Sequence, residues 1–112
     1  MDLTSNRQGA YQIITVNAPR IDAAAAIAFK EALRAQTADG SEDVLLDLGA
    51  VEFIDSSGLG AIVAALKLVG PGRRLDLARL TPDVEKVFRL TRMNTIFTIH
   101  EALEDAAPRR AG

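Results

Sequence analysis

The sequence predicts a small α/β domain: a single unit in which α-helices flank a mixed, mostly parallel β-sheet. A continuous apolar run over residues 44–48, broken only by Asp47, is typical of a central strand covered on both faces. Strand-like and helix-like segments alternate after the first two strands, which favours right-handed crossovers between parallel strands. At 112 residues the chain has the size of one domain, with its core over about residues 10–107 and a solvated tail over 108–112.

The first part of the chain predicts two strands and a helix. Residues 1–9 are polar and indicate a weak edge strand or a frayed end, and residues 10–18 alternate as a strand that Pro19 ends. Asp22 is a good N-cap, so we expect a helix from there to about Gln36. Its buried stripe should consist of residues spaced three and four apart, namely Phe29, Ala32, Leu33 and Gln36.

The helix after the central strand has two apolar sides. We expect it over residues 57–69, with a core stripe of Leu59, Ile62, Val63 and Leu66. The other side is also apolar and contains Ala61, Ala64, Ala65 and Leu68. That side is either covered or exposed as a docking patch, and we favour the patch because few elements are left to cover it.

The remaining segments complete the alternation. Residues 70–72, Gly-Pro-Gly, break the chain, and residues 74–78 alternate as a strand. Thr81-Pro82-Asp83 predicts a helix start, with Val84, Val87 and Phe88 as the buried stripe. A short strand over residues 96–99 and a short helix over residues 101–107 should follow.

The segment Asp55-Ser56-Ser57-Gly58-Leu59-Gly60 stands where a strand passes into a helix. The first N–H groups of a helix lack intrahelical partners, and aspartate and serine side chains accept from them. The glycines leave the backbone bare, and a helix N-terminus favours the negative charge of a phosphate. For an arbitrary sequence of this type, plain helix capping with a tight turn would be the better explanation, because such caps are common.

Composition and motifs argue against an enzyme. A nucleophile elbow needs glycine two residues before the serine, where Asp55 stands before Ser57, and no dinucleotide or phosphate-binding loop pattern occurs. The one histidine, His100, is interpreted as a surface or capping residue. The acidic groups Glu42-Asp43 and Glu101, Glu104, Asp105 are interpreted as solvated faces, so we expect no metal and no cofactor.

The balance of charge and hydropathy indicates a cytoplasmic protein. A net charge of −2 argues against nucleic acid as a main partner, and the chain has no cysteine. The first residues show no signal-like apolar core, and the longest apolar run is far shorter than the ~20 residues of a membrane span. We therefore expect no membrane insertion.

The stretch VLLDLGAVEFIDSSGLGAIVAALK closely resembles the signature of STAS domains, in particular of bacterial anti-sigma factor antagonists. The similarity extends over about residues 10–105 and includes residues 20–24, 81–88 and 96–97. The sequence departs from the usual family pattern in two places: Pro19 stands where glycine is common, and Arg92-Met93 replaces Gly-Leu.

The resemblance implies a regulator that binds an anti-sigma factor with serine kinase activity and so releases the sigma factor. It implies that this kinase phosphorylates Ser57, and that a metal-dependent phosphatase reverses the reaction. The partner-binding surface would then contain Asp22, Asp55, Ser56, Ser57, Gly58 and Leu59, together with Ala61 and Leu68 of the docking patch. The alternative is an accessory subunit of an ATPase or lipid-transport complex, never phosphorylated, and a small nucleotide-binding domain is a distant third.

Overall fold

The computed structural model describes residues 1–70 and 72–105, and these form an α/β domain as predicted. The main sheet contains β1 (Leu3–Gln8), β2 (Tyr11–Val16), β4 (Asp43–Asp47), β6 (Leu75–Ala78) and β7 (Ile99–His100), in that spatial order. β1 is antiparallel to β2 and lies at the edge, whereas every other pair is parallel. The prediction of a mixed, mostly parallel sheet is therefore confirmed.

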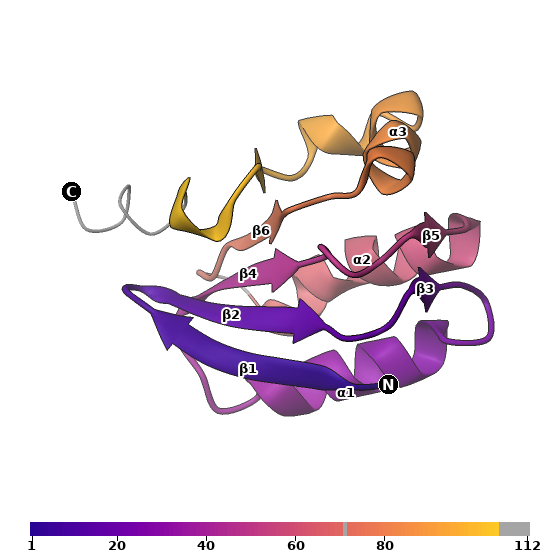
Figure 1. The fold of residues 1–112 in the computed structure, drawn as a ribbon. Coiled ribbons are helices and arrows are strands. Elements are labelled where there is room, and N and C mark those ends of the chain that lie inside the picture. The colour runs from indigo at the N-terminus through magenta and orange to yellow at the C-terminus, as the bar shows by residue number, and fades with distance from the viewer. Residues whose placement is uncertain (71, 106–112) are drawn as a thin grey trace.

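A second, two-stranded sheet lies beyond the carboxyl ends of β2 and β4 (Figure 1). It pairs β3 (Arg20–Ile21) with β5 (Phe53–Ile54) in parallel, with Arg20 opposite Phe53 and Ile21 opposite Ile54. The sequence did not predict these strands as a pair. As a result, the Asp55–Gly60 segment follows β5, and not directly the central strand β4.

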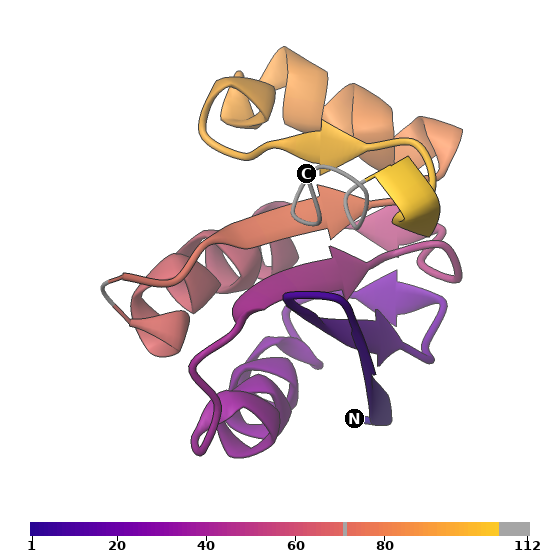
Figure 2. The ribbon, with the colours of Figure 1, turned by 90° about the vertical axis from the view of Figure 1, so that its left-hand side faces the viewer.

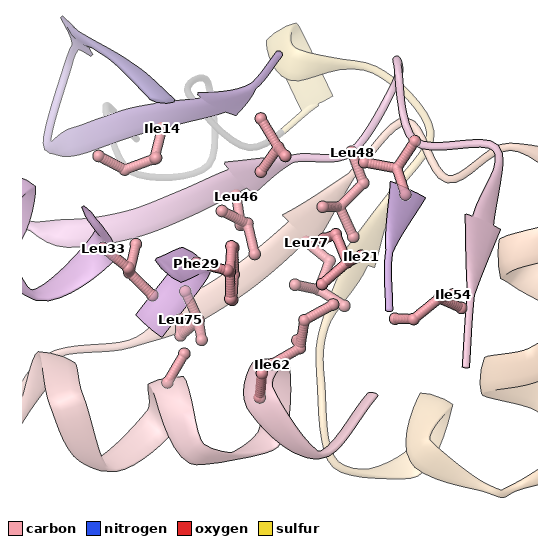
Figure 3. Close-up of a cluster of buried hydrophobic side chains, with 14 of the residues drawn as sticks. Ile14, Ile21, Phe29, Leu33, Leu46, Leu48, Ile54, Ile62, Leu75 and Leu77 are labelled. Atoms are coloured by element: carbon pink, nitrogen blue, oxygen red, sulfur yellow. The ribbon is translucent and has the colours of Figure 1, made fainter. Parts of the chain in front are cut away.

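Helices α1 (Ala26–Thr37) and α2 (Ser56–Val69) lie on one face of the main sheet, and α3 (Pro82–Leu90) lies at the far end of the molecule from α1 (Figures 1 and 2). Two short 3₁₀ helices, η1 (Met93–Thr95) and η2 (Leu103–Asp105), flank β7 along the chain. The core between α1, α2 and the sheet is made of aliphatic side chains and Phe29 (Figure 3). Its members on β4 are fully buried, as the apolar run predicted.

Helix α1 begins four residues later than predicted. Asp22 does not cap it: its Oδ1 accepts from the Ala25 N–H at 3.2 Å and so closes a turn over residues 22–25. Phe29 and Leu33 are fully buried, as expected, but Gln36 is exposed. Thr37 takes the buried place, and its hydroxyl donates to the carbonyl of Leu33.

The C-terminal elements occur in the predicted order, but the last strand and the last helix begin at other residues than predicted. β6 and α3 occur where expected, with Val84 and Phe88 fully buried and Thr81 at the N-cap position. The expected strand over residues 96–99 is displaced, because Ile96 is half exposed while Phe97 turns inward and stacks edge-on against Phe88. Of the expected final helix only η2 lies within the described residues, and residue 71 and residues 106–107 fall outside them.

The sheet face away from α1 and α2 carries a buried polar cluster that the sequence analysis missed. His100 is only 4% exposed, and its Nε2 lies 2.9 Å from Oδ2 of Asp76, which also accepts from the Tyr11 hydroxyl. The interpretation of His100 as a surface residue is wrong. Asp43, expected on a solvated face, is also buried and accepts from the Arg74 N–H.

Candidate functional site

The candidate site is the surface where the N-terminal end of α2 meets β3 and the turn that follows it. Strand alternation points Ile21 and Ile54 into the core, so their neighbours Arg20 and Phe53 point outward. The predicted phosphorylation site begins immediately after β5 and continues into the first turn of α2.

Asp55 connects the two halves of this site. It caps α2, because its Oδ1 accepts from the Gly58 N–H at 2.8 Å. Its other oxygen, Oδ2, accepts from the N–H of Ala23 at 3.0 Å, in the turn that follows β3. The hydrogen bond from Gly58 and those from Ala23 and Ser57 hold the pKa of Asp55 below its usual range, although partial burial opposes them. Asp55 is therefore a carboxylate that fixes the turn against the helix.

Gly58 makes the closest backbone contact of the site. A Cβ placed on it would lie 1.8 Å from the carbonyl oxygen of Ile21, which only a glycine avoids. Gly60, two residues later in the motif, has open space where its Cβ would lie. The first glycine of the motif therefore brings α2 against β3, and it is buried under the surface rather than part of it.

The two serines of the motif face outward. Ser56 and Ser57 are both exposed in the first turn of α2, and Leu59 beside them is half-buried. A modifying enzyme could reach either hydroxyl without unfolding the helix. The dipole of α2 makes this end of the helix favourable for a phosphate.

Asp22 lies on the same surface and is occupied on both oxygens. Oδ1 closes the turn to Ala25, and Oδ2 pairs with Nε of Arg20 at 3.2 Å. The guanidinium carbon of Arg20 lies 4.2 Å from the centre of the Phe53 ring, a cation–π contact. Phe53 is 40% exposed, which is unusual for a large aromatic side chain. The sequence analysis missed Arg20 and Phe53 as site residues, because their contact depends on the pairing of two strands of two residues each.

The prediction that the alanine-rich side of α2 is an exposed docking patch is wrong. Ala61 and Ala65 are buried, at 3% and 0% exposure, and belong to the core. Ala64 and Leu68 are half-buried, and Leu59, Val63 and Leu66, expected in the core, are half-buried as well. The physical reason is the close approach at Gly58, which turns the small-residue side of α2 inward. Ala61 therefore supports the site from below and is not available to a partner.

Neither a metal-binding cluster nor a membrane-spanning helix is found within residues 1–70 and 72–105. No group of three or more histidine, cysteine or acidic side chains there is arranged to hold a metal ion. None of the helices in that part is long and apolar enough to cross a membrane.

The arrangement of these elements and the motif matches known proteins. Residues 4–106 match the family described as STAS domain. The chain belongs to this family. Apart from Leu3, the first residue of β1, the match covers every strand and helix of the described fold, so the resemblance to STAS domains is confirmed for the whole domain.

Relatives of this STAS domain carry names from sigma factor regulation. One is BtrV of Bordetella bronchiseptica, described as a candidate anti-sigma factor antagonist and 34% identical over 76 residues, which are 67% of this chain and 66% of that protein. The chain thus matches slightly less than two thirds of that relative's length. An anti-sigma factor antagonist from Mycobacterium paratuberculosis has a solved structure with a TM-score of 0.84 and 25% identity, covering 99% of this chain and 94% of the other.

A second solved structure shows the same fold in a modified protein. It is the Bacillus cell fate determinant SpoIIAA in its phosphorylated form, with a TM-score of 0.67, 17% identity, and coverage of 96% of this chain and 98% of that one. At this identity the likeness concerns the fold alone.

Proposed function

We propose that this STAS domain is an anti-sigma factor antagonist that binds an anti-sigma factor with serine kinase activity. Phosphorylation of Ser57 would switch it off, and a metal-dependent phosphatase would restore it, in the cytoplasm. The names of the relatives support antagonism. The observation that carries the switch is the exposed Ser57 in the first turn of α2, beside a carboxylate that is already fixed by backbone N–H groups.

Phosphorylation would change the charge of this surface more than its shape. A phosphoserine adds about −1.5 to −2 charges at pH 7. The dipole of α2 accommodates that charge, so the fold should persist. The added dianion would lie two residues from Asp55 along the chain, and Asp55 binds the turn that contains Asp22, so negative charge would be concentrated on this surface. Burying such a spot against a partner without matched cations is costly, so binding should fall.

The residues predicted to bind the partner divide into two groups by their accessibility. Asp22, Ser56, Ser57 and the half-buried Leu59 and Leu68 have surface that a partner can reach, and Asp55 is partly accessible. Gly58 and Ala61 are buried and act by positioning α2. We propose the first group as the partner surface.

The test uses purified anti-sigma factor kinases from the source organism with ATP. Wild type and Ser56→Ala should be phosphorylated, whereas Ser57→Ala should not be labelled and should bind its kinase constitutively. Ser57→Asp should bind more weakly while retaining its circular dichroism spectrum. Equal labelling of Ser57→Ala and wild type would exclude Ser57 as the acceptor. Absence of phosphate on protein isolated from its host, measured by intact mass under all growth conditions tried, would favour the unphosphorylated accessory subunit.

Asp22 provides an independent check of the partner surface. Asp22→Asn retains a side-chain oxygen for the Ala25 N–H but loses the charge that pairs with Arg20. We expect an unchanged fold and weaker kinase binding in a titration at fixed ionic strength. If the affinity is unchanged, Asp22 only shapes the turn.

A further inference from the structure

We propose that Arg20 is a phosphate-responsive residue that exchanges its partners when Ser57 is phosphorylated, an inference that rests on the proposed function. In the unmodified protein Arg20 holds Asp22 and covers Phe53. In the phosphorylated protein its guanidinium binds the phosphoserine instead. The exchange frees the Asp22 carboxylate and uncovers the Phe53 ring on the same surface.

The present contacts of Arg20 are of the kind that can be exchanged. The side chain of Arg20 is 57% exposed and that of Asp22 is 25% exposed, with a single Nε–Oδ2 contact at 3.2 Å. Exposed ion pairs of this kind contribute ~0–1 kcal/mol, since water screens both charges. The cation–π contact to the half-exposed Phe53 ring is similarly weak. Asp22 keeps its second oxygen on the Ala25 N–H, so the turn does not depend on Arg20.

The chain around Arg20 lies against the chain around Ser57. Arg20 is opposite Phe53 in the β3–β5 pair, Ala23 N–H binds Asp55, and the carbonyl of Ile21 touches the backbone of Gly58. Residues 20–23 thus run alongside residues 53–58. Arg20 and Ser57 are exposed and Asp22 is half-buried. Arginine is long and flexible, and the contact with Phe53 places the Arg20 side chain over β5, the strand that leads into α2.

The charges favour the exchange in one direction. A phosphoserine carries up to twice the charge of the Asp22 carboxylate and three acceptor oxygens that match the planar fork of arginine. Among residues 1–70 and 72–105, Arg20 is the cation that pairs with a carboxylate of this site, and Asp55 has no ion pair there. The new dianion would therefore meet two carboxylates and one nearby guanidinium.

The exchange would give the two forms of the protein different surfaces. The unmodified form presents a neutralised Arg20–Asp22 pair over a shielded aromatic ring. The phosphorylated form presents a free carboxylate, a phosphate partly neutralised by arginine and an open ring. A kinase and a phosphatase could distinguish these surfaces without any movement of the helices.

The experiment places phosphoserine at position 57 by codon suppression, so that it does not depend on a kinase. Titration of the phosphate by ³¹P NMR gives its midpoint pH in wild type and in Arg20→Gln. If Arg20 binds the phosphate, we expect the midpoint to rise by about 0.5 to 1 in Arg20→Gln, since an opposite charge favours the dianion. Arg89→Gln is the matched control, because within the described part of the chain Arg89 forms its ion pair with Glu85 on α3, so this variant should leave the midpoint unchanged.

Two further measurements isolate the direct contact. In an Asp22→Asn background the Arg20→Gln shift should persist, which excludes an indirect effect of unmasking Asp22. The side-chain protons of Arg20 should show ring-current shifts from Phe53 in the unmodified protein, and these should be lost on phosphorylation. An unchanged midpoint in Arg20→Gln, a shift that disappears in the Asp22→Asn background, or ring-current shifts that survive phosphorylation would each overturn the proposal.

Failure of the Arg20 exchange can be distinguished from failure of the proposed function. If no host kinase phosphorylates Ser57, the proposed switch fails, yet the titration of the built-in phosphoserine still measures whether Arg20 responds. Conversely, a Ser57 that is phosphorylated in the cell with no response from Arg20 would retain the switch and reject the exchange.

Discussion

Replacing Gly58 by alanine tests the contact that holds the candidate site together. The added Cβ would lie 1.8 Å from the Ile21 carbonyl oxygen, 2.7 Å from its carbon and 3.0 Å from Cγ1 of Ile54. Ordinary van der Waals contact begins near 3.4 Å, so α2 and β3 would have to separate by about 1.6 Å. The nearest obstacle is backbone, which cannot rotate away as a side chain would.

The expected cost follows from this overlap. Overpacking in a core usually costs about 1–3 kcal/mol, and a backbone obstacle places Gly58→Ala at or above the upper end. Alanine recovers up to about 1 kcal/mol of helix propensity over glycine. We expect a net loss of roughly 2–3 kcal/mol in the free energy of unfolding, and a fall in Tm of about 10–20 °C at 4–8 °C per kcal/mol.

Gly60→Ala in the same helix is the matched control. Its Cβ would meet nothing within 4 Å, so we expect the variant to gain about 0.5–1 kcal/mol from helix propensity alone. Urea denaturation followed by far-ultraviolet circular dichroism gives both values with the same baseline. A Gly58→Ala protein as stable as wild type would refute the close approach of α2 to β3, and with it the positioning role assigned to Gly58.

Three further predictions concern other contacts of the fold. The low pKa of Asp55 stabilises the folded state at neutral pH, and this contribution is lost as pH falls through the folded-state pKa. The stability difference between wild type and Asp55→Asn should therefore narrow in urea titrations below about pH 4. Burial, together with the hydrogen bond to Asp76, raises the pKa of Tyr11, so its ionisation should occur above pH 10. Because Tyr11 is the only tyrosine and the chain has no tryptophan, absorbance near 295 nm measures the ionisation of this residue alone. The pKa of Tyr11 is higher in the folded state than in the unfolded state. Its contribution to stability is therefore intact below pH 10 and is lost as pH rises through the folded-state pKa. Arg73→Ala should cost about 2–4 kcal/mol in urea denaturation, because the guanidinium donates to the carbonyls of Glu42, Thr37 and Val69, whereas the exposed Arg34→Ala should stay within about 0.5 kcal/mol of wild type.

The sequence by itself determined the features that depend on local pattern. The apolar run of β4 predicted a strand buried on both faces, and the structure buries every one of its residues. Thr81-Pro82-Asp83 placed the start of α3, because proline and a β-region cap favour helix initiation whatever surrounds them. The Asp55 cap and the outward serines also follow from the local chemistry of a helix N-terminus.

Only the tertiary structure decided which side of α2 is buried and what surrounds Ser57. α2 is apolar on both sides, so its periodicity could not choose between them. The choice was made by the contact of Gly58 with the Ile21 carbonyl, which lies 37 residues earlier in the chain. β3 and β5 contain two residues each, too few to show any alternation, and their pairing brings Arg20 over Phe53. The same pairing lets the Ala23 N–H meet Asp55 and delays the start of α1 past Asp22. Such contacts join segments more than thirty residues apart and form only when the chain folds. Local sequence patterns therefore do not predict them.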